Sequence, residues 1–259
     1  MAKREIIRLQ VTESTNLEAL EAGQKGAAPG TVVVADAQTG GRGRLNRSWL
    51  SLSGMGLYFS IILRPRLDPE HLPKVTLAAG LALCKAVEVE YSLSPEIKWP
   101  NDLLLDGRKF GGILTETESI AGLGSIHPTL VVVGVGLNLF SPDVGLPVDL
   151  EGRATFISRH TDREISVEIL LEACVVAIEE ELQRLEKGEF PAILKEWMQR
   201  DASQGKVLTW VTPKSKVVTG LSQGPDADGV LRIRDQAGII HTVLSGDVNL
   251  AGKIPEQEN

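Results

Sequence analysis

A loop rich in glycine and arginine is the part of the sequence whose residue types are best suited to bind an anion. Between Gln38 and Trp49 the chain carries three glycines and three arginines and no acidic residue. Glycine lets backbone N–H groups approach an anion closely, and the planar guanidinium of arginine matches phosphate or carboxylate oxygens. The loop therefore favours a phosphorylated small molecule over two alternatives, an exposed basic loop and a loop that touches nucleic acid.

A second polar segment interrupts two apolar stretches. After Pro100, the side chains of Asn101 and Asp102 could point at a ligand, and the carboxylate could hold Mg²⁺, which prefers oxygen ligands. An Asx turn is the alternative. Further on, Lys109 follows an Asp-Gly pair that predicts a hairpin turn, and a glycine pair comes after it. Its ammonium could stand beside backbone that a ligand can approach, and a solvated turn lysine is the alternative.

Composition restricts the partners of these groups. The chain has 259 residues, with 27 Lys and Arg against 34 Asp and Glu, and a formal net charge of −7. This balance argues against a general polyanion-binding surface, so an anionic ligand must be met by a local cluster. The four histidines are dispersed, which argues against zinc, and Cys84 and Cys174 fall in apolar helical patterns typical of reduced core thiols. Because the N-terminus lacks a signal-peptide pattern and no long apolar run occurs, we expect a cytoplasmic protein without a membrane span.

Apolar periodicity predicts the elements that must position these loops. Short apolar runs predict strands at 6–9, 32–35, 57–63, 96–99, 103–105, 109–115 and 130–139. Apolar residues at three- and four-residue spacing predict helices after Ser14 and at 71–91, 166–185 and 190–200. The run at 130–139 is the most apolar and should be the central strand of an α+β (mixed α/β) fold.

The texture of the sequence changes after Gly205. Short alternating strands are predicted at 207–211, 217–221, 230–233 and 239–244, separated by Pro213, Gly224-Pro225 and Gly229. This pattern favours a small antiparallel barrel. The predicted division is therefore a larger domain, 1–204, and a smaller one, 205–259.

Five separate blocks between residues 14 and 139 can be read together. They are Ser14-Thr15-Asn16, the loop Gly41-Arg42-Gly43-Arg44-x-x-Arg47-x-Trp49, the segment Lys98-Trp99-Pro100-Asn101-Asp102, the strand Lys109-Phe110-Gly111-Gly112-Ile113-Leu114-Thr115-Glu116, and Gly134-Val135-Gly136-Leu137-Asn138. In this order they closely resemble the biotin protein ligases, also called biotin–[acetyl-CoA-carboxylase] ligases. The resemblance implies a class II synthetase-like central sheet with helices and a small C-terminal SH3-like β-barrel.

The resemblance also implies a two-step, ATP-dependent and Mg²⁺-dependent reaction. Biotin and ATP would give biotinyl-5′-adenylate and pyrophosphate, and the acyl group would pass to a lysine of a biotin carboxyl carrier domain of acetyl-CoA carboxylase or a similar enzyme. Lys109 matches the lysine that bridges the biotin carboxylate and the α-phosphate. The stretch Arg42-Gly43-Arg44 matches a loop that orders over the adenylate, with Arg44 as the candidate for retaining it.

The remaining matched positions divide between biotin and the nucleotide. Ser14, Thr15 and Gln38 match residues that hold the ureido ring, Asn138 matches one near adenine, and Trp49 is expected either to pack over the ligand or to anchor the loop. Asp102 is the hypothesis both for a magnesium ligand and for assistance in deprotonating the acceptor lysine. The full expected set has Lys109, Arg42, Arg44 and Asp102 as catalytic residues and, as binding residues, Ser14, Thr15, Asn16, Gln38, Gly41, Arg42, Gly43, Arg44, Arg47, Trp49, Asn101, Lys109, Gly111, Gly112 and Asn138.

Several alternatives and expected absences accompany this interpretation. Lipoate or octanoate ligases and transferases share the broad chemistry but lack the glycine- and arginine-rich loop, and a biotin-binding sensor without catalysis is a further alternative. Only 13 residues precede Ser14, so we expect no helix-turn-helix domain and no nucleic-acid partner. A homodimer through sheet edges occurs in the family and stays open.

Overall fold

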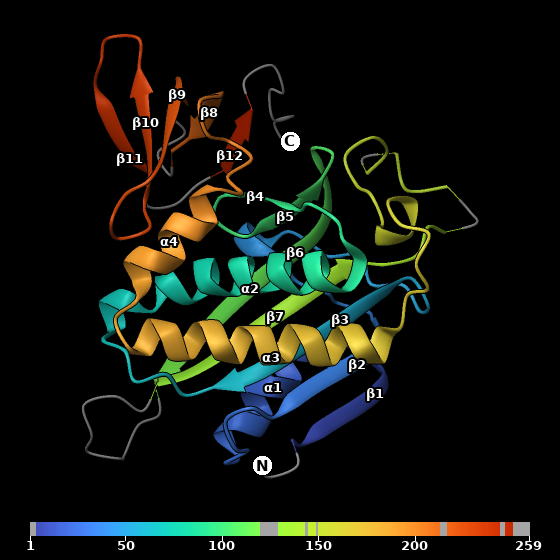
Figure 1. Cartoon of the computed structure of the whole chain (residues 1–259). Helices are drawn as coiled ribbons and strands as arrows, with labels where there is room; N and C mark the ends of the chain where they lie inside the picture. Colours follow the sequence, from blue (N-terminus) through green and yellow to red (C-terminus); the bar gives the residue numbers. More distant parts are fainter. Residues whose placement is uncertain are drawn as a thin grey trace.

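A seven-stranded mixed β-sheet forms the larger part of the molecule (Figure 1). This computed structural model describes residues 4–119, 129–142, 145–148, 150–212, 217–243 and 247–250. The strands cross the sheet in the order β1-β2-β3-β7-β6-β5-β4. Their bounds are β1 Ile6–Thr12, β2 Val32–Gln38, β3 Gly56–Leu63, β4 Glu96–Lys98, β5 Asp102–Leu105, β6 Arg108–Ser119 and β7 Thr129–Asn138. The predicted central strand is confirmed, since β7 stands in the middle of the sheet.

The α-helices cover the two faces of this sheet unequally. α2 and α3 lie side by side across one face, α4 packs against both of them, and α1 packs against the opposite face (Figure 1). α1 connects β1 to β2, which are parallel, whereas the other neighbouring pairs of the sheet are antiparallel. The bounds are α1 Thr15–Gln24, α2 Pro73–Tyr91, α3 Val167–Glu186 and α4 Phe190–Met198, with short 3₁₀ turns η1 Arg44–Asn46, η2 Pro69–His71 and η3 Ile157–Arg159.

Strand alternation assigns each residue of β7 to one face. Val131, Val133, Val135 and Leu137 of β7 belong to the large core beneath α2 and α3, whereas Leu130 and Val132 pack with Ala19 of α1. Beyond Val132 the α1 face continues with Gly134 and Gly136. Because glycine has no side chain, this part of the sheet presents backbone that other groups can approach closely.

A second, antiparallel sheet follows α4. Its strands, in the order β11-β10-β9-β8-β12, are β8 Val207–Val211, β9 Val217–Pro225, β10 Leu231–Asp235, β11 Ile240–Val243 and β12 Asp247–Leu250. The turn between β9 and β10 touches the larger sheet and its helices. Gly229 O accepts a hydrogen bond of 2.9 Å from Trp99 Nε1, and Lys74 Nζ lies 3.2 Å from Asp228 Oδ1.

Most predicted elements are confirmed to within a few residues at their ends, where assignments commonly differ. One prediction for the second sheet was wrong, and one of its strands was missed. Pro225 was predicted to separate strands, but it is the last residue of β9 and pairs with Leu231. A proline is tolerated there because the end of a strand does not require its missing N–H donor. The strand β12 was not predicted. Leu244, Pro213 and one of the four histidines, His127, lie outside the described residues.

The structure bears on two further predictions, that the cysteines are reduced core thiols and that the chain has no membrane span. Cys84 of α2 and Cys174 of α3 are buried free thiols. Within the described part of the chain, no helix has both the length and the apolar character needed to cross a bilayer.

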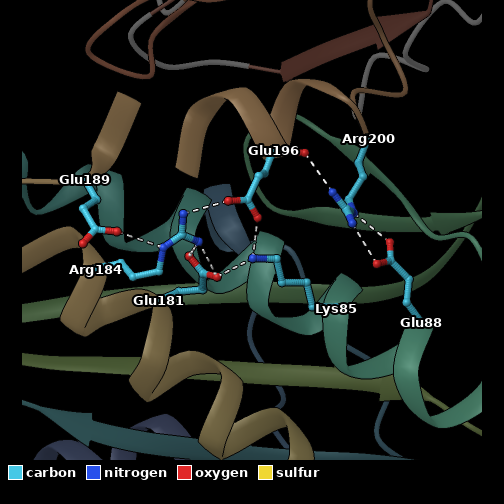
Figure 2. Close-up of polar contacts among 7 residues, drawn as sticks. All are labelled: Lys85, Glu88, Glu181, Arg184, Glu189, Glu196 and Arg200. Atoms are coloured by element: carbon cyan, nitrogen blue, oxygen red, sulfur yellow. Dashed lines mark hydrogen bonds and ion pairs between the residues drawn. The ribbon is translucent and has the colours of Figure 1, made fainter. Parts of the chain in front are cut away.

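A cluster of ion pairs joins α2, α3 and α4 (Figure 2). Lys85 Nζ of α2 lies 2.7 Å from a Glu181 oxygen of α3 and 2.5 Å from a Glu196 oxygen of α4. Arg184 contacts the same two carboxylates at 2.8 and 2.7 Å. The Glu181 side chain is only 5% exposed, which is tolerated because both cations bind it. The cluster thereby ties together the helical layer that covers the sheet.

We expect the stabilisation that this cluster provides to be lost in acid. Burial by itself raises the pKa of Glu196, but hydrogen bonds from Lys85 and Arg184 outweigh it and bring the pKa below the usual 4.5. The unfolded carboxyl therefore binds protons more readily than the folded one. The stabilisation is complete above about pH 4.5 and is lost as the pH falls through the lower, folded pKa.

Urea unfolding of the wild type and E196Q, from about pH 7 down to about pH 3, tests this expectation. The wild type should be the more stable protein at neutral pH, and the difference in the free energy of unfolding should shrink in acid. A difference that does not change with pH would contradict the assignment.

Candidate functional site

The glycine- and arginine-rich loop folds back on itself between β2 and β3. Gly43 N donates to Arg47 O at 2.7 Å, and Trp49 N donates to Gly41 O at 2.8 Å, so the two arms of the loop are joined. A Cβ on Gly41 would lie 2.4 Å from Trp49 O, which is why the close approach of the arms requires glycine. The short turn η1 forms the tip and carries Arg44.

Trp49 packs onto the bare backbone of β6 and β7. A Cβ added to Gly136 would lie 2.4 Å from Trp49 Nε1, and one added to Gly112 would lie 3.0 Å from the ring. The Lys109 ammonium lies 5.1 Å from the ring centre, within cation–π range. Trp49 Nε1 is buried and has no hydrogen-bond partner among the described residues. The indole therefore anchors the loop to the sheet and presents an N–H donor beside Lys109.

The start of α1 places polar side chains against β2 and β3. Thr15 N and Oγ1 both donate to Gln38 Oε1, at 2.8 and 3.2 Å. Ser60 Oγ lies 2.8 Å from Thr15 Oγ1 and 2.6 Å from Asn16 Oδ1. The helix begins directly after Ser14, as predicted. Ser14 is buried at the N-cap position, but its side chain makes no capping hydrogen bond. These groups form one hydrogen-bonded cluster at the helix terminus.

A carboxylate of β6 joins this cluster to the arginine loop. Glu116 Oε2 accepts a hydrogen bond of 2.8 Å from Asn16 Nδ2 and an ion pair of 2.6 Å from Arg42 Nη2. A Cβ on Gly134 would lie 1.9 Å from Asn16 Oδ1, so the position of Asn16 depends on a glycine beneath it. Glu116 is not among the predicted site residues, because no local pattern pairs it with an arginine 74 positions earlier.

The opposite end of β6 carries an ion pair between Lys109 Nζ and Asp102 Oδ1, which are 2.6 Å apart. Asn101 Nδ2 donates to Ile113 O at 2.7 Å, which fixes the turn between β4 and β5. Arg44 Nη1 donates to Asn101 Oδ1 at 3.3 Å. The tip of the arginine loop therefore reaches across to the turn that precedes Asp102.

A β-bulge in β6 determines which face Lys109 occupies. Leu103 pairs with Gly111, but Leu104 pairs with Lys109, so Phe110 is an extra residue without a partner on β5. Strict alternation would put Lys109 on the same face as Gly111, toward the core under α2. With the bulge, the ammonium joins the polar groups of the α1 face.

The backbone of Lys109 is held by a segment that takes the place of β7 where that strand ends. Lys109 N donates to Arg153 O at 2.9 Å, and Thr155 N donates to Lys109 O at 2.8 Å. Asn138, the last residue of β7, donates from Nδ2 to Thr155 O at 3.2 Å. The role predicted for Asn138 near adenine remains a prediction.

Acidic residues from other strands balance the cations of the site. Arg42 is paired with Glu116 and Lys109 with Asp102, so the local positive cluster expected from sequence has carboxylates within it. In the parts of the chain that the structure describes, no three His, Cys, Asp or Glu side chains gather as metal ligands would. The arrangement can bind an anion by exchanging one of these carboxylates for a ligand oxygen.

Comparison with known proteins assigns a family to this arrangement. The model described as the biotin/lipoate A/B protein ligase family matches residues 8–138. The chain belongs to this family. A biotin–[acetyl-CoA-carboxylase] ligase of Paracoccus denitrificans is 31% identical over 237 residues, 88% of this chain and 93% of that one. A bifunctional ligase/repressor of Bacillus subtilis is 31% identical over 245 residues, 95% of this chain and 74% of that one.

A solved structure narrows the assignment within the biotin/lipoate ligase family. The biotin protein ligase of Aquifex aeolicus, solved in complex with biotin and ATP, superposes with a TM-score of 0.79 at 27% identity. The match covers 96% of this chain and 100% of that one. Together with the named relatives, it shows that this chain is a biotin protein ligase, an enzyme with a large central mixed sheet and a C-terminal β-sheet.

The structure brings most predicted site residues of this ligase to the α1 face. Gly111 and Arg47 stand apart from that group, and Asn138, at an even-numbered position of β7 like Gly136, contacts a different segment. Gly111 faces the other side of β6, where a Cβ would lie 2.7 Å from the Leu137 side chain. Arg47 has an exposed side chain on the returning arm of the loop, and Asn138 contacts the segment beside Lys109. The gathered residues are Ser14, Thr15, Asn16, Gln38, Gly41, Arg42, Gly43, Arg44, Trp49, Asn101, Asp102, Lys109 and Gly112.

Proposed function

We propose that this biotin protein ligase activates biotin with ATP and then transfers the biotinyl group to a lysine of a biotin carboxyl carrier domain. The single observation that carries the proposal is the placement of Lys109. The bulge at Phe110 turns its ammonium onto the glycine-lined face, beside the Trp49 indole and opposite the Arg44 loop tip. A fixed cation at that point can hold two anionic groups that would otherwise repel each other.

The first half-reaction joins two anions. A biotin carboxylate oxygen attacks the α-phosphorus of ATP, the bond from that phosphorus to the bridging oxygen breaks, and pyrophosphate leaves. Lys109 would exchange Asp102 for the carboxylate and α-phosphate oxygens, so that its charge offsets the charge that builds up between them. Activation is needed because a carboxylate is a poor electrophile, whereas the adenylate has AMP as its leaving group.

The cluster at the start of α1 supports recognition of the ureido ring of biotin. Thr15 is hydrogen-bonded to Gln38, and Ser60 connects Thr15 to Asn16. The buried Ser14 hydroxyl makes no capping bond to the helix. A ligand with both N–H donors and a carbonyl acceptor satisfies such groups. A site with buried polar partners strongly rejects analogues that leave them unpaired.

The arginine loop supports retention of the adenylate. Its tip contacts Asn101 through Arg44, and its base is fixed on β6 and β7 by Trp49. A loop held at both ends can exclude water and stray amines from the reactive acyl phosphate. Arg42 and Arg44 are the residues that we assign to hold the intermediate, and the buried Trp49 Nε1 can donate to it.

For magnesium, Asp102 is the carboxylate that the described residues place near the proposed nucleotide position. Asp102 fits a shared site of the usual kind, in which one or two carboxylates and the nucleotide phosphates hold the ion, once Lys109 has turned to the substrate. When bound, the ion would offset phosphate charge. We propose no further protein ligand for it.

The second half-reaction requires a neutral amine. The acceptor lysine attacks the adenylate carbonyl, AMP leaves, and the nitrogen loses a proton. With an unperturbed pKa of about 10.4, only about one such amine in 2,500 is neutral at pH 7. We propose that Asp102 takes this proton after pyrophosphate has left, because it lies within the site and Lys109 no longer holds it.

D102N tests this assignment by separating the half-reactions. Transfer of biotin from preformed biotinyl-adenylate to a carrier domain should fall about 10²-fold, since general base catalysis contributes about 10²–10⁴. Quenched-flow measurement of carrier mass gives the transfer rate. D228N, which removes another lysine-paired carboxylate outside the site, is the matched control. Full transfer by D102N would remove the role.

The organisation around this chemistry is also proposed. We assign the biotin and ATP site to residues 1–204 and a separate SH3-like domain to residues 205–259, supported by the start of the second sheet at Val207. We propose the cytoplasm as its compartment and a carrier domain as its protein partner. Homodimerisation stays open, and the absence of a nucleic-acid partner remains a prediction from the sequence.

The direct test is incubation with Mg-ATP, biotin and a carrier domain, following AMP release and carrier mass. Biotin-dependent AMP formation with one biotinyl group added per carrier is the expected result. Lipoate in place of biotin should give neither product. Lipoate-dependent AMP would select the lipoate ligase alternative, and biotin binding without AMP would select the sensor.

A further inference from the structure

A threonine, a histidine and an aspartate form a connected line beside the catalytic strand, outside the residues assigned above. His160 Nδ1 lies 3.1 Å from Asp106 Oδ2, and His160 Nε2 lies 2.8 Å from Thr155 Oγ1. The Thr155 residue is fully buried and the His160 side chain is 9% exposed, whereas the Asp106 side chain is 78% exposed. The order resembles a nucleophile, base and acid, but a fully buried hydroxyl cannot meet a substrate.

The two ends of this line touch the chain on both sides of Lys109. Asp106 occupies the turn between β5 and β6, three residues before Lys109, with a left-handed φ of 49°. Thr155 lies beside Lys109 and donates its backbone N–H to Lys109 O at 2.8 Å. His160 therefore connects the turn that precedes the lysine to the segment that replaces β7 alongside it.

This connection matters because Lys109 lies next to the bulge. The extra residue Phe110 interrupts the ladder between β5 and β6. The direction of the Lys109 side chain therefore depends on the other contacts of the backbone around it. A catalytic ammonium displaced by about 1 Å can lose about 10²-fold in rate.

We propose that His160 is a positioning residue for adenylation, acting on Lys109 through Thr155 and Asp106. The inference rests on the proposed function. In the tautomer with the proton on Nδ1, the imidazole donates to the Asp106 carboxylate, and Nε2 accepts from the Thr155 hydroxyl. Both neighbours of Lys109 are thus held by one rigid ring.

The test compares the two half-reactions in H160Q, T155V and the double variant. For each single variant, kcat of biotin-dependent adenylation should fall about tenfold, while KM for biotin and ATP changes by less than about twofold. Transfer from preformed biotinyl-adenylate should be unchanged, because Lys109 acts in the first step. T155S, which keeps the hydroxyl, should restore wild-type kcat.

A second histidine–aspartate pair supplies the matched control. His241 Nε2 lies 2.7 Å from Asp235 Oδ2 in the second sheet, and H241Q breaks the same type of contact away from Lys109. It should leave both half-reactions unchanged. The double variant H160Q/T155V should be no slower than the slower single variant, because both changes break one connection.

Three results would overturn the inference. The first is adenylation by H160Q at the wild-type rate. The second is a parallel fall of the adenylation rate, the transfer rate and the thermal midpoint, which would mark a purely structural histidine. The third is a strictly additive loss of adenylation rate in the double variant. The wild type is run in the same assay. A wild type that forms no adenylate refutes the proposed function and this inference with it, whereas an active wild type beside an equally active H160Q refutes the inference alone.

Discussion

K109A should form biotinyl-adenylate about 10²–10³-fold more slowly than the wild type, the usual loss when one preorganised charge donor is removed from a reacting centre. The side chain is about one-third exposed, and its removal leaves Asp102 partly accessible to water, so the fold should persist. Single-turnover AMP formation and a thermal unfolding curve, measured on the same preparation, give both quantities.

The matched control for Lys109 is K25A. Lys25 is also an ion-paired lysine, bound to Glu21 on α1, but it lies on the surface outside the site. It should adenylate biotin at the wild-type rate. If K109A unfolds, K109R supplies the second measurement, because it keeps the charge and the pair with Asp102 but changes the point charge to a planar fork. Wild-type adenylation by a folded K109A would refute the assigned role.

G134A should weaken biotin binding at least about tenfold and destabilise the fold by about 1–3 kcal/mol. The added Cβ would lie 1.9 Å from Asn16 Oδ1 and 2.7 Å from its Cγ, so the amide must move. Asn16 then loses its contact with Ser60 and its hydrogen bond to Glu116, which also holds Arg42. One methyl group thus disturbs the ureido cluster and the loop together.

Calorimetric titration with biotin and urea unfolding measure these two effects. G80A is the control, because a Cβ on Gly80 of α2 would have its nearest neighbours at 3.7 Å or beyond, and alanine favours a helix. G80A should bind biotin as the wild type does and be no less stable. Wild-type affinity in G134A would show that Asn16 does not contribute to the biotin site.

Local patterns predicted the parts of the fold that depend on neighbouring residues. The apolar run at 130–139 identified the central strand, and the Asp106-Gly107 pair identified the hairpin because both residues adopt the left-handed φ that this turn requires. The role of the loop glycines was also predictable from the sequence, since backbone segments that approach each other closely require glycine.

Long-range contacts were not predictable from the same patterns. Glu116 meets Arg42 only because β6 passes beside the loop that follows β2, and Thr155 meets Lys109 only because β7 ends at Asn138. The bulge is a different case. The glycine pair after Phe110 is a known signal for an irregular strand, but alternation alone would have turned Lys109 to the wrong face.

The extra residue in β6 makes the chemistry of this enzyme depend on chain length as well as on residue identity. Inserting one residue between Leu103 and Leu104, opposite Phe110, would complete the ladder with β5 and turn Lys109 toward the helices, although every catalytic side chain would still be present. Insertions and deletions are ordinarily best tolerated near hairpin turns. The hairpin from Leu103 to Gly111 should be an exception, a place where lineages of this enzyme can exchange residues but cannot gain one opposite Phe110.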